Sequence, residues 1–313
     1  MISPNSKIAI TGANGLVGTA LCEELRQQGY TNLALLTRDL CDLTDFQKVK
    51  SVFATCQPDV VFHTAATVYG IGGNAAYKGS IFTENIWVNT HVIEASRLCG
   101  VKKIVAMGTI AAYPEPKTYP VKEGSIWDGP PHQSEASYGH AKRAMLAQLT
   151  AYREAYGLDF AYVISTNLFG PNDKFNPIYG HVIPSLVCKC YEAKMNGSPV
   201  IVWGDGTAER DFLYSKDMAR ALVLIMNQFT GAINVASGQK TSIKEAVRLL
   251  AEYYQIEHRI QWDPAKPNGR KYYEIDLNLL KSMGFAPAYS FQEGLIETLD
   301  WYTLRAEENL VRI

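Results

Sequence analysis

Short apolar runs alternate along the chain with longer segments in which apolar residues recur every three or four positions. In the first half the apolar runs cover residues 7–11, 33–36, 59–63 and 103–107. Short continuous runs of this kind are typical of strands that are buried on both faces of a parallel sheet. The pattern therefore predicts repeated strand–helix units, with a long helix over residues 85–98.

The second half continues the alternation in smaller units. Strands are predicted for residues 160–164, 200–203 and 232–236, and we expect the last of these to return to the main sheet. Ser242-Ile-Lys-Glu245 is typical of a capping box that starts a helix, and the final helix covers residues 291–304. We predict an α/β fold with a doubly wound, mostly parallel sheet and a smaller C-terminal lobe.

Composition and charge narrow the classes of function. The 313 residues are 47% hydrophobic and 19% charged, with a formal net charge of -1, so nothing favours a nucleic acid or an acidic membrane as partner. No apolar run approaches the roughly 20 residues that span a bilayer, and the first residues lack the apolar core of a secretory signal. The six cysteines are scattered, and Cys188 and Cys190 lack the second pair of a zinc site. We expect a cytoplasmic protein without a metal.

A glycine-rich turn follows the first apolar run. Gly12, Gly15 and Gly18 have the spacing G-x-x-G-x-x-G between a predicted strand and a predicted helix. Glycines in such a turn let the backbone approach a pyrophosphate, which binds at the helix N-terminus. A plain strand-to-helix turn is the alternative interpretation. The residues assigned to the cofactor here are Gly12, Asn14, Gly15, Leu16, Val17 and Gly18.

The end of the second apolar run bears on the choice between NAD and NADP. NAD sites place a carboxylate there against the ribose hydroxyls, whereas NADP sites use an Arg for the 2′-phosphate. Arg38 therefore favours NADP(H), and Asp39 favours NAD if its side chain faces the ribose instead. Residues 42–45 are either a turn near the adenine or a helix cap. Small residues after the third run let the backbone lie close to the cofactor, and the further residues assigned to it are Asp42, Leu43, Ala65, Ala66 and Thr67.

Tyr138 and Lys142 are candidates for acid–base chemistry. They are four residues apart in a segment with helical spacing, so they share one helix face. An ammonium beside a phenol favours the phenolate, and we expect it to lower the pKa of Tyr138 from its usual value near ~10. A phenol tuned in this way exchanges a proton at a carbonyl or hydroxyl carbon. Thr109 follows the fourth run, where its hydroxyl can bind the same oxygen; an ordinary pair on a helix surface is the alternative.

Further motifs run through the chain in order. They include Val68-x-Gly-Ile-x-x-Asn74, Tyr113-Pro114, Thr166-Asn-Leu-Phe-Gly-Pro171, Asp173, Phe175, His181-Val-Ile-Pro184 and Val202-Trp-Gly-x-Gly-Thr207 with Arg210. Together with the glycine turn, Thr109, Tyr138 and Lys142, they resemble the extended short-chain dehydrogenase/reductase superfamily, and more narrowly the GDP-L-fucose synthase family. The resemblance covers essentially the whole chain.

This resemblance implies a Rossmann-like fold, NADP(H) as cofactor, a nucleotide-linked sugar with GDP as the favoured nucleotide as substrate, and a homodimer. The catalytic hydroxyl, phenol and amine of the family fall on Thr109, Tyr138 and Lys142. Asn85 is expected to support a proton relay. The Cys that epimerises the sugar in the family falls on Ala111, which has no titratable group.

The resemblance also divides the chain. Residues 1–165 are predicted to bind NADP, and residues 211–240 to return to that unit. Residues 166–210 and 241–313 are predicted to form the substrate-binding lobe.

The second half supplies the predicted substrate contacts. The residues assigned to the substrate are Thr109, Asn167, His181, Lys189, Trp203, Arg210 and Arg270, and His181 is also assigned to the cofactor. A cation at Lys189 or Arg210 can neutralise a diphosphate, and Trp203 can stack on a base. The alternatives are a backbone-bonded helix start for His181, a core aromatic for Trp203 and a surface salt bridge for Arg210.

We expect an NADPH-dependent reductase that reduces C4 of a nucleotide-linked 4-keto-6-deoxy sugar without epimerising C3 or C5. The rival enzymes are a 3,5-epimerase/4-reductase of the GDP-L-fucose synthase type and an NAD-dependent nucleotide-sugar 4-epimerase. A 4,6-dehydratase is disfavoured, because residues 110–111 lack the Asp-Glu pair of such enzymes. A non-catalytic NADP-binding protein is the rival from another class.

Overall fold

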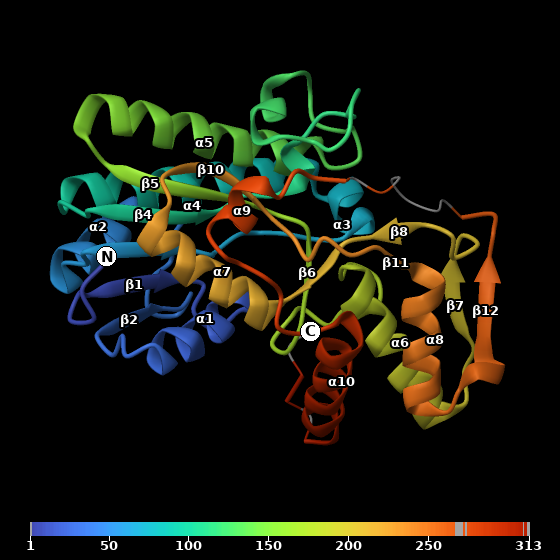
Figure 1. Cartoon of the computed structure of the whole chain (residues 1–313). Helices are drawn as coiled ribbons and strands as arrows, with labels where there is room; N and C mark the ends of the chain where they lie inside the picture. Colours follow the sequence, from blue (N-terminus) through green and yellow to red (C-terminus); the bar gives the residue numbers. More distant parts are fainter. Residues whose placement is uncertain (1, 267–271, 273, 309, 312–313) are drawn as a thin grey trace.

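A twisted sheet of parallel strands forms the centre of the computed structural model, which describes residues 2–266, 272, 274–308 and 310–311. In the described chain this sheet has six strands in the order β10-β5-β4-β3-β1-β2 (Figure 1). The strands are β1 (Ile8–Thr11), β2 (Leu33–Leu36), β3 (Val60–His63), β4 (Lys103–Met107), β5 (Asp159–Ser165) and β10 (Gly231–Val235). The predicted α/β fold with a mostly parallel sheet is confirmed, and the strand at 232–236 does return to the main sheet.

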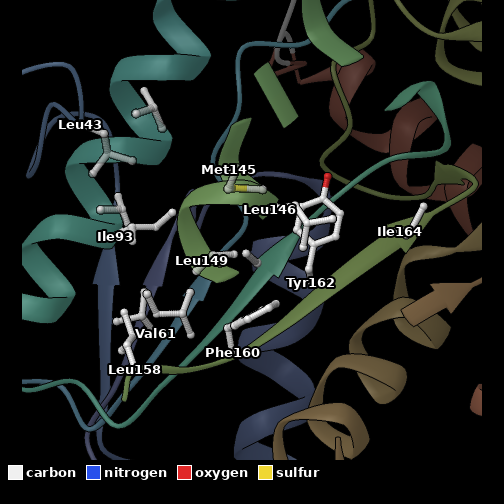
Figure 2. Packing of buried hydrophobic residues seen from close by; sticks show 14 of the residues in the cluster. Leu43, Val61, Ile93, Met145, Leu146, Leu149, Leu158, Phe160, Tyr162 and Ile164 are labelled. Carbon is white, nitrogen blue, oxygen red and sulfur yellow. The ribbon is translucent and has the colours of Figure 1, made fainter. Parts of the chain in front are cut away.

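Helices cover both faces of this sheet because the strand side chains alternate between two cores. Ala9 and Val61 face a core shared with α2 (Phe46–Cys56), α4 (Lys78–Leu98) and α5 (Ala136–Tyr156). Figure 2 shows part of this core, where Met145, Leu146 and Leu149 lie against Phe160 and Tyr162.

The opposite face carries the second core. Ile8, Ile10, Val60 and Phe62 pack there with α1 (Leu16–Gln27) and α7 (Ser215–Gln228). All of these strand residues are fully buried, which explains why the strands appear as continuous apolar runs in the sequence.

A third core holds the smaller C-terminal elements together. It gathers apolar side chains of α6 (Val182–Asn196), α8 (Ile243–Tyr254) and α10 (Phe291–Glu307). Three two-stranded sheets accompany these helices: β6 (Asn167–Phe169) with β9 (Phe212–Tyr214), β7 (Val200–Trp203) with β12 (Ile260–Asp263), and β8 (Glu209–Arg210) with β11 (Thr241–Ser242). The remaining elements are α3 (Ile71–Ala76), α9 (Asn278–Ser282), η1 (Ile110–Ala112), η2 (Glu123–Trp127) and η3 (Glu257–Arg259).

One predicted boundary is wrong. Helix α4 begins at Lys78 rather than at Asn85, and the glycine-rich residues before it form α3. Gly70 caps α3 in direct contact with a distant loop, since a Cβ there would lie 2.2 Å from the Gly180 carbonyl oxygen. This tertiary contact orders a segment whose composition suggests only a loop.

Within the described residues no helix combines the length and the apolar character needed to cross a membrane. In the same part of the chain, no group of three or more His, Cys, Asp or Glu side chains could hold a metal ion. All six cysteines are free thiols.

Asn234 joins β10 to two long connections. Its Oδ1 accepts from the Tyr113 hydroxyl at 2.7 Å, and its Nδ2 donates to the carbonyls of Val121 and Asp276, each at 3.1 Å. The side chain is fully buried, and so is that of Tyr113, so its loss would leave the Tyr113 hydroxyl without this partner, whereas the Val121 carbonyl also accepts from the Asp276 N–H at 2.9 Å.

Asn234→Ala is therefore expected to lower the free energy of unfolding by about 3 kcal/mol, because it leaves buried polar groups unpaired. Urea denaturation measures the change. The exposed Asn32 serves as the control, and Asn32→Ala is expected to stay within about 0.5 kcal/mol of the unchanged protein. Equal effects of the two substitutions would contradict this account of Asn234.

Candidate active site

The candidate site lies at the carboxyl ends of the strands, where β1 and β3 are neighbours. The chain passes from β1 outward to β2 and then back to β3, so the direction of winding changes between β1 and β3. Ligands of open α/β sheets bind in the crevice that such a switch point leaves. Thr11 and His63 are paired at these two strand ends.

The glycine turn fits closely against the start of the β3–α3 connection. Gly12 has a φ of +68°, and a Cβ on it would lie 3.0 Å from the backbone of Ala65. A Cβ on Gly18 would lie 2.2 Å from the Gly12 carbonyl oxygen. Gly15 begins α1 without a side chain that caps the helix, so the first turn of α1 is open to an anionic ligand. Asn14 is exposed, and Leu16 and Val17 are half-buried beside it.

The residues after β2 occupy two different environments. Arg38 and Asp39 are exposed, and Asp42 accepts two hydrogen bonds from Thr44, which lower the pKa of its carboxyl together with the charge of Arg38. Leu43 points away from the surface: its side chain packs in the first core, and its carbonyl oxygen is 2.9 Å from Nδ1 of His91. The Leu43 side chain is thus a core group.

Asn85 fixes the loop that follows β3. Its Oδ1 accepts from the Thr67 N–H at 3.2 Å, and its Nδ2 donates to the carbonyls of Thr67 and Ile81 at 2.8 and 2.7 Å. Both hydrogens of its amide nitrogen are engaged, and the proton relay expected of Asn85 stays a prediction. Asn85 holds Thr67, beside Ala65 and Ala66, in place.

Thr109 follows β4 directly, and the helix that carries Tyr138 and Lys142 packs against the same segment. Thr109 begins η1, and its Oγ1 accepts from the Ala111 N–H at 3.1 Å. The first turn of α5 lies directly against η1, because a Cβ on Gly139 would be 2.5 Å from the Ala111 carbonyl oxygen. One helical turn further along α5, the Lys142 Nζ is 5.7 Å from the centre of the Tyr138 ring.

Burial dominates the electrostatics of this pair. Lys142 is 0% exposed, and its Nζ has no hydrogen-bond partner within the protein. Burial lowers the pKa of this amine to about 7. Burial, followed by the negative charge of Glu135, raises the pKa of the Tyr138 phenol above its usual value. The predicted lowering of the phenol pKa is therefore wrong for the ligand-free protein, because desolvation outweighs the attraction of the amine.

An unpaired buried amine is a feature that a dinucleotide site explains. Buried polar groups are nearly always hydrogen-bonded, and a ligand with acceptor oxygens would pair Lys142. The tight glycine turn after β1 offers backbone N–H groups for a pyrophosphate. The residues present thus fit a bound NADP(H) or NAD(H).

The ends of β1 and β3 carry a buried hydrogen-bond network that sequence reasoning missed. The Thr11 Oγ1 is 2.8 Å from His63 Nδ1, and His63 Nε2 is 3.0 Å from Asn89 Oδ1. Burial, followed by the charge of Lys142, lowers the pKa of His63 to about 3, so this imidazole is neutral. The three residues are far apart in sequence, and no spacing signal connects them.

The predicted substrate residues form one connected group and several separate ones. The Asn167 Nδ2 donates to the carbonyl of Asp211 at 3.1 Å, next to Arg210, whose Nη1 donates to the Glu209 carbonyl at 2.6 Å. Asp211 was not predicted. Its buried carboxylate accepts from Thr166 and from the residues after β10, and burial raises its pKa.

The other predicted substrate residues lie on different elements. His181 is exposed at the start of α6, Lys189 is half-buried further along α6, and Trp203 is 51% exposed on β7 with the Lys266 Nζ 5.8 Å from its ring centre. Arg270 lies outside the described residues. In the described part of the chain, no hydrogen bond, ion pair or ring contact joins His181, Lys189 or Trp203 to Tyr138.

Comparisons with known proteins agree with this fold and crevice. The model of the NAD dependent epimerase/dehydratase family matches residues 8–236. The chain is 37% identical over 315 residues to the putative GDP-L-fucose synthase 2 of Arabidopsis thaliana, covering 100% of this chain and 95% of that protein.

Solved structures give the same picture. A GDP-6-OMe-4-keto-L-xylo-heptose reductase from C. jejuni superposes with a TM-score of 0.91 at 27% identity, covering 97% of this chain and 99% of that one. A GDP-mannoheptose C4 reductase from Campylobacter jejuni with NADP bound superposes with a TM-score of 0.86 at 28% identity, covering 97% and 100%. The chain belongs to the NAD dependent epimerase/dehydratase family, within the extended short-chain dehydrogenases/reductases.

Proposed function

We propose that the protein is an NADPH-dependent reductase that converts the C4 ketone of a GDP-linked 4-keto-6-deoxy sugar to an alcohol without epimerising C3 or C5. The proposal is supported above all by the buried amine of Lys142, which has no hydrogen-bond partner within the protein and lies 5.7 Å from the Tyr138 ring centre, on a helix that packs against the segment after Thr109. The GDP-sugar enzymes among the relatives and similar structures supply the substrate class.

The N-terminal elements would hold the cofactor, which when bound supplies a hydride to the ketone carbon. The glycine turn at residues 12–18 would take the pyrophosphate, and the exposed Arg38 would pair with the 2′-phosphate of NADP. The C-terminal residues 166–210 and 241–313 would hold the nucleotide sugar. Asn167 and Arg210 would contact the sugar nucleotide together, since the Asn167 Nδ2 donates to the carbonyl of Asp211, the neighbour of Arg210.

The protein's own residues would supply the proton to the reduced oxygen. Because the pKa of Tyr138 is raised, its phenol carries a proton at neutral pH and can donate it to the oxygen that forms at C4. The Lys142 ammonium stabilises the resulting phenolate from the same helix face. The Thr109 Oγ1 already accepts from the Ala111 N–H, so its own proton is available to the substrate oxygen.

The absence of epimerisation follows from Ala111. This residue is 3% exposed and follows Thr109 by two positions, where the resemblance places the epimerisation Cys. A methyl group cannot remove a proton from C3 or C5. The GDP-L-fucose synthases among the relatives favour the second candidate, a 3,5-epimerase/4-reductase, which would need another proton donor such as the exposed His181.

The deciding experiment measures NADPH and NADH oxidation with GDP-, dTDP- and CDP-linked 4-keto-6-deoxy sugars in deuterated water, with NMR of each product. We expect NADPH-dependent turnover of the GDP-linked sugar and no solvent deuterium at C3 or C5. Deuterium at either carbon would support the 3,5-epimerase/4-reductase. Oxidation of neither cofactor with any of the sugars would refute the proposal.

Tyr138→Phe removes the proton donor and keeps the ring. We expect kcat for ketone reduction to fall by about 10²–10⁴-fold, the usual contribution of general acid catalysis, while the Kd for NADPH changes by less than about threefold. Tyr152→Phe, near the other end of α5, serves as the matched control and should leave kcat unchanged. Similar rates for Tyr138→Phe and the control would exclude the assigned role.

Lys142→Met measures how much the buried amine destabilises the fold. The folded-state pKa of about 7 lies below the ordinary 10.5, so the buried amine destabilises the ligand-free fold most below pH 7, and the effect fades as pH approaches 10.5. The substitution should therefore raise the free energy of unfolding by about 2–5 kcal/mol at pH 6.5, and by less at pH 9.5.

Urea denaturation of ligand-free protein at both pH values measures the effect. Lys103 is the matched control, because this buried amine donates to the Phe229 carbonyl at 2.6 Å and is 3.3 Å from Asp159. Lys103→Met should destabilise the protein. Lys142→Met destabilising it equally would show that Lys142 has a partner within the protein.

A further inference from the structure

Arg143 is a buried cation next to the candidate site, and the proposed mechanism gives it no task. It follows Lys142 on α5 and is 9% exposed. Its Nε donates to the Ala112 carbonyl at 2.7 Å in a bond that is buried from solvent, while its Nη2 has no hydrogen-bond partner within the described residues. An apolar side chain of similar length would fill this space without the cost of burying a charge, so packing alone does not explain the arginine.

The hydrogen bond of Arg143 reaches the short turn that begins with the candidate catalytic hydroxyl. Thr109 precedes η1 and Ala112 ends it, and the Ala112 N–H donates to the Thr109 carbonyl at 3.1 Å. Within the same turn the Thr109 Oγ1 accepts from the Ala111 N–H. A shift of η1 relative to α5 therefore moves the Thr109 hydroxyl relative to Tyr138.

Helix geometry puts Arg143 in the row beside the Tyr138 and Lys142 pair. Residues four apart share a face of a helix, so Tyr138 and Lys142 form one row along α5. One position further along, Gly139 and Arg143 form the adjoining row. This second row lies against η1, because a Cβ on Gly139 would be 2.5 Å from the Ala111 carbonyl oxygen and Arg143 binds the next carbonyl. The helix that presents the phenol and the amine thus also holds η1.

The two ends of this segment are fixed by contacts that do not involve Arg143. Before the segment, Gly108 lies on the Tyr162 ring of β5, since a Cβ on Gly108 would be 2.5 Å from that ring. After it, the Tyr113 hydroxyl donates to a side chain of β10 at 2.7 Å. Between these ends, Gly139 supplies packing and Arg143 supplies a directional hydrogen bond. A change at Arg143 should therefore loosen η1 while the fold around it remains.

We propose that Arg143 is a positioning residue: it holds η1 against α5 through the Ala112 carbonyl and so fixes the Thr109 hydroxyl relative to the Tyr138 phenol. This role deepens the proposed function and rests on it for the parts played by Thr109 and Tyr138. Placement of this kind matters for the rate, because a displacement of about 1 Å at a reacting group can lower a rate by about 10²-fold.

Two substitutions separate the hydrogen bond of Arg143 from its charge. Arg143→Gln removes the charge but keeps an N–H at the same place along the side chain, because the Gln Nε2 and the Arg Nε are both attached to Cδ. Arg143→Met puts a methyl group at that place and keeps a similar length. Arg153→Met is the matched control, since Arg153 is exposed near the other end of α5. Thermal unfolding checks that each variant is folded.

Hydrogen exchange of the ligand-free protein, followed by mass spectrometry, measures how firmly η1 is held. We expect the amides of residues 109–113 to exchange about tenfold faster in Arg143→Met, because the buried Ala112 carbonyl loses its partner. Arg143→Gln and Arg153→Met should exchange as the unchanged protein does. Exchange in Arg143→Met equal to that of the unchanged protein, or exchange in Arg143→Gln as fast as in Arg143→Met, would overturn the proposal.

Kinetics with the GDP-linked 4-keto-6-deoxy sugar measure the consequence for the site. We expect kcat to fall by about 10–100-fold in Arg143→Met and to stay unchanged in Arg143→Gln, with the Kd for NADPH changed by less than about threefold in both. In a Thr109→Val background, Arg143→Met should lower kcat no further, because the hydroxyl that Arg143 positions is already gone. The same fall in both backgrounds would show that Arg143 acts elsewhere and would overturn the proposal.

The two measurements separate the role of Arg143 from the proposed function. Hydrogen exchange needs no sugar, so it decides whether Arg143 holds η1 whatever the substrate is. If the unchanged protein reduces none of the 4-keto sugars, the proposed function fails, and the exchange of residues 109–113 still supports or overturns the hold of Arg143 on η1.

Discussion

The structure depends on one buried positive charge without a partner. Lys142 reaches the centre of the molecule from the second turn of α5, and its Nζ meets no acceptor within the protein. Burying an unpaired ammonium disfavours the charged form, and the lowered pKa of the amine expresses this. Under the proposed function, a bound cofactor would pair this amine, which gives its unfavourable burial a reason.

The loops after β3 and β6 contact each other directly. Gly70 donates its N–H to the Tyr179 carbonyl at 2.8 Å, and the Lys174 Nζ lies 4.2 Å from the centre of the Tyr69 ring. The loop after β3 is thereby joined to the loop after β6, which ends at His181, one of the residues assigned to the sugar. Backbone and side-chain contacts thus connect the first unit of the chain to the C-terminal elements.

Much of this architecture could be predicted from the sequence. The runs at residues 33–36 and 103–107 coincide with β2 and β4, because helices cover both faces of the sheet and favour apolar residues along the strands, even in the half-buried edge strand β2. Tyr138 and Lys142 could be paired because helix geometry alone places residues four apart on one face. These predictions use only local spacing.

What could not be predicted depends on distant residues. The phenol pKa of Tyr138 was expected to fall and instead rises, because the degree of burial is set by the packing of α5 against η1. His63 looks like the end of an apolar strand, and its hydrogen bonds appear only with Thr11 and Asn89, which are 52 and 26 positions away. The start of α4 was misplaced because the contact of Gly70 with Gly180 orders the residues before it.

The most direct test of the unpaired ammonium is the proton balance of cofactor binding. Calorimetry of NADPH binding at pH 8, in buffers of different ionisation enthalpy, gives the number of protons taken up. An amine that titrates at about 7 when free and is paired by the ligand should take up about one proton per site, and Lys142→Met should lose this uptake. No uptake by the unchanged protein, or equal uptake by the variant, would contradict the account.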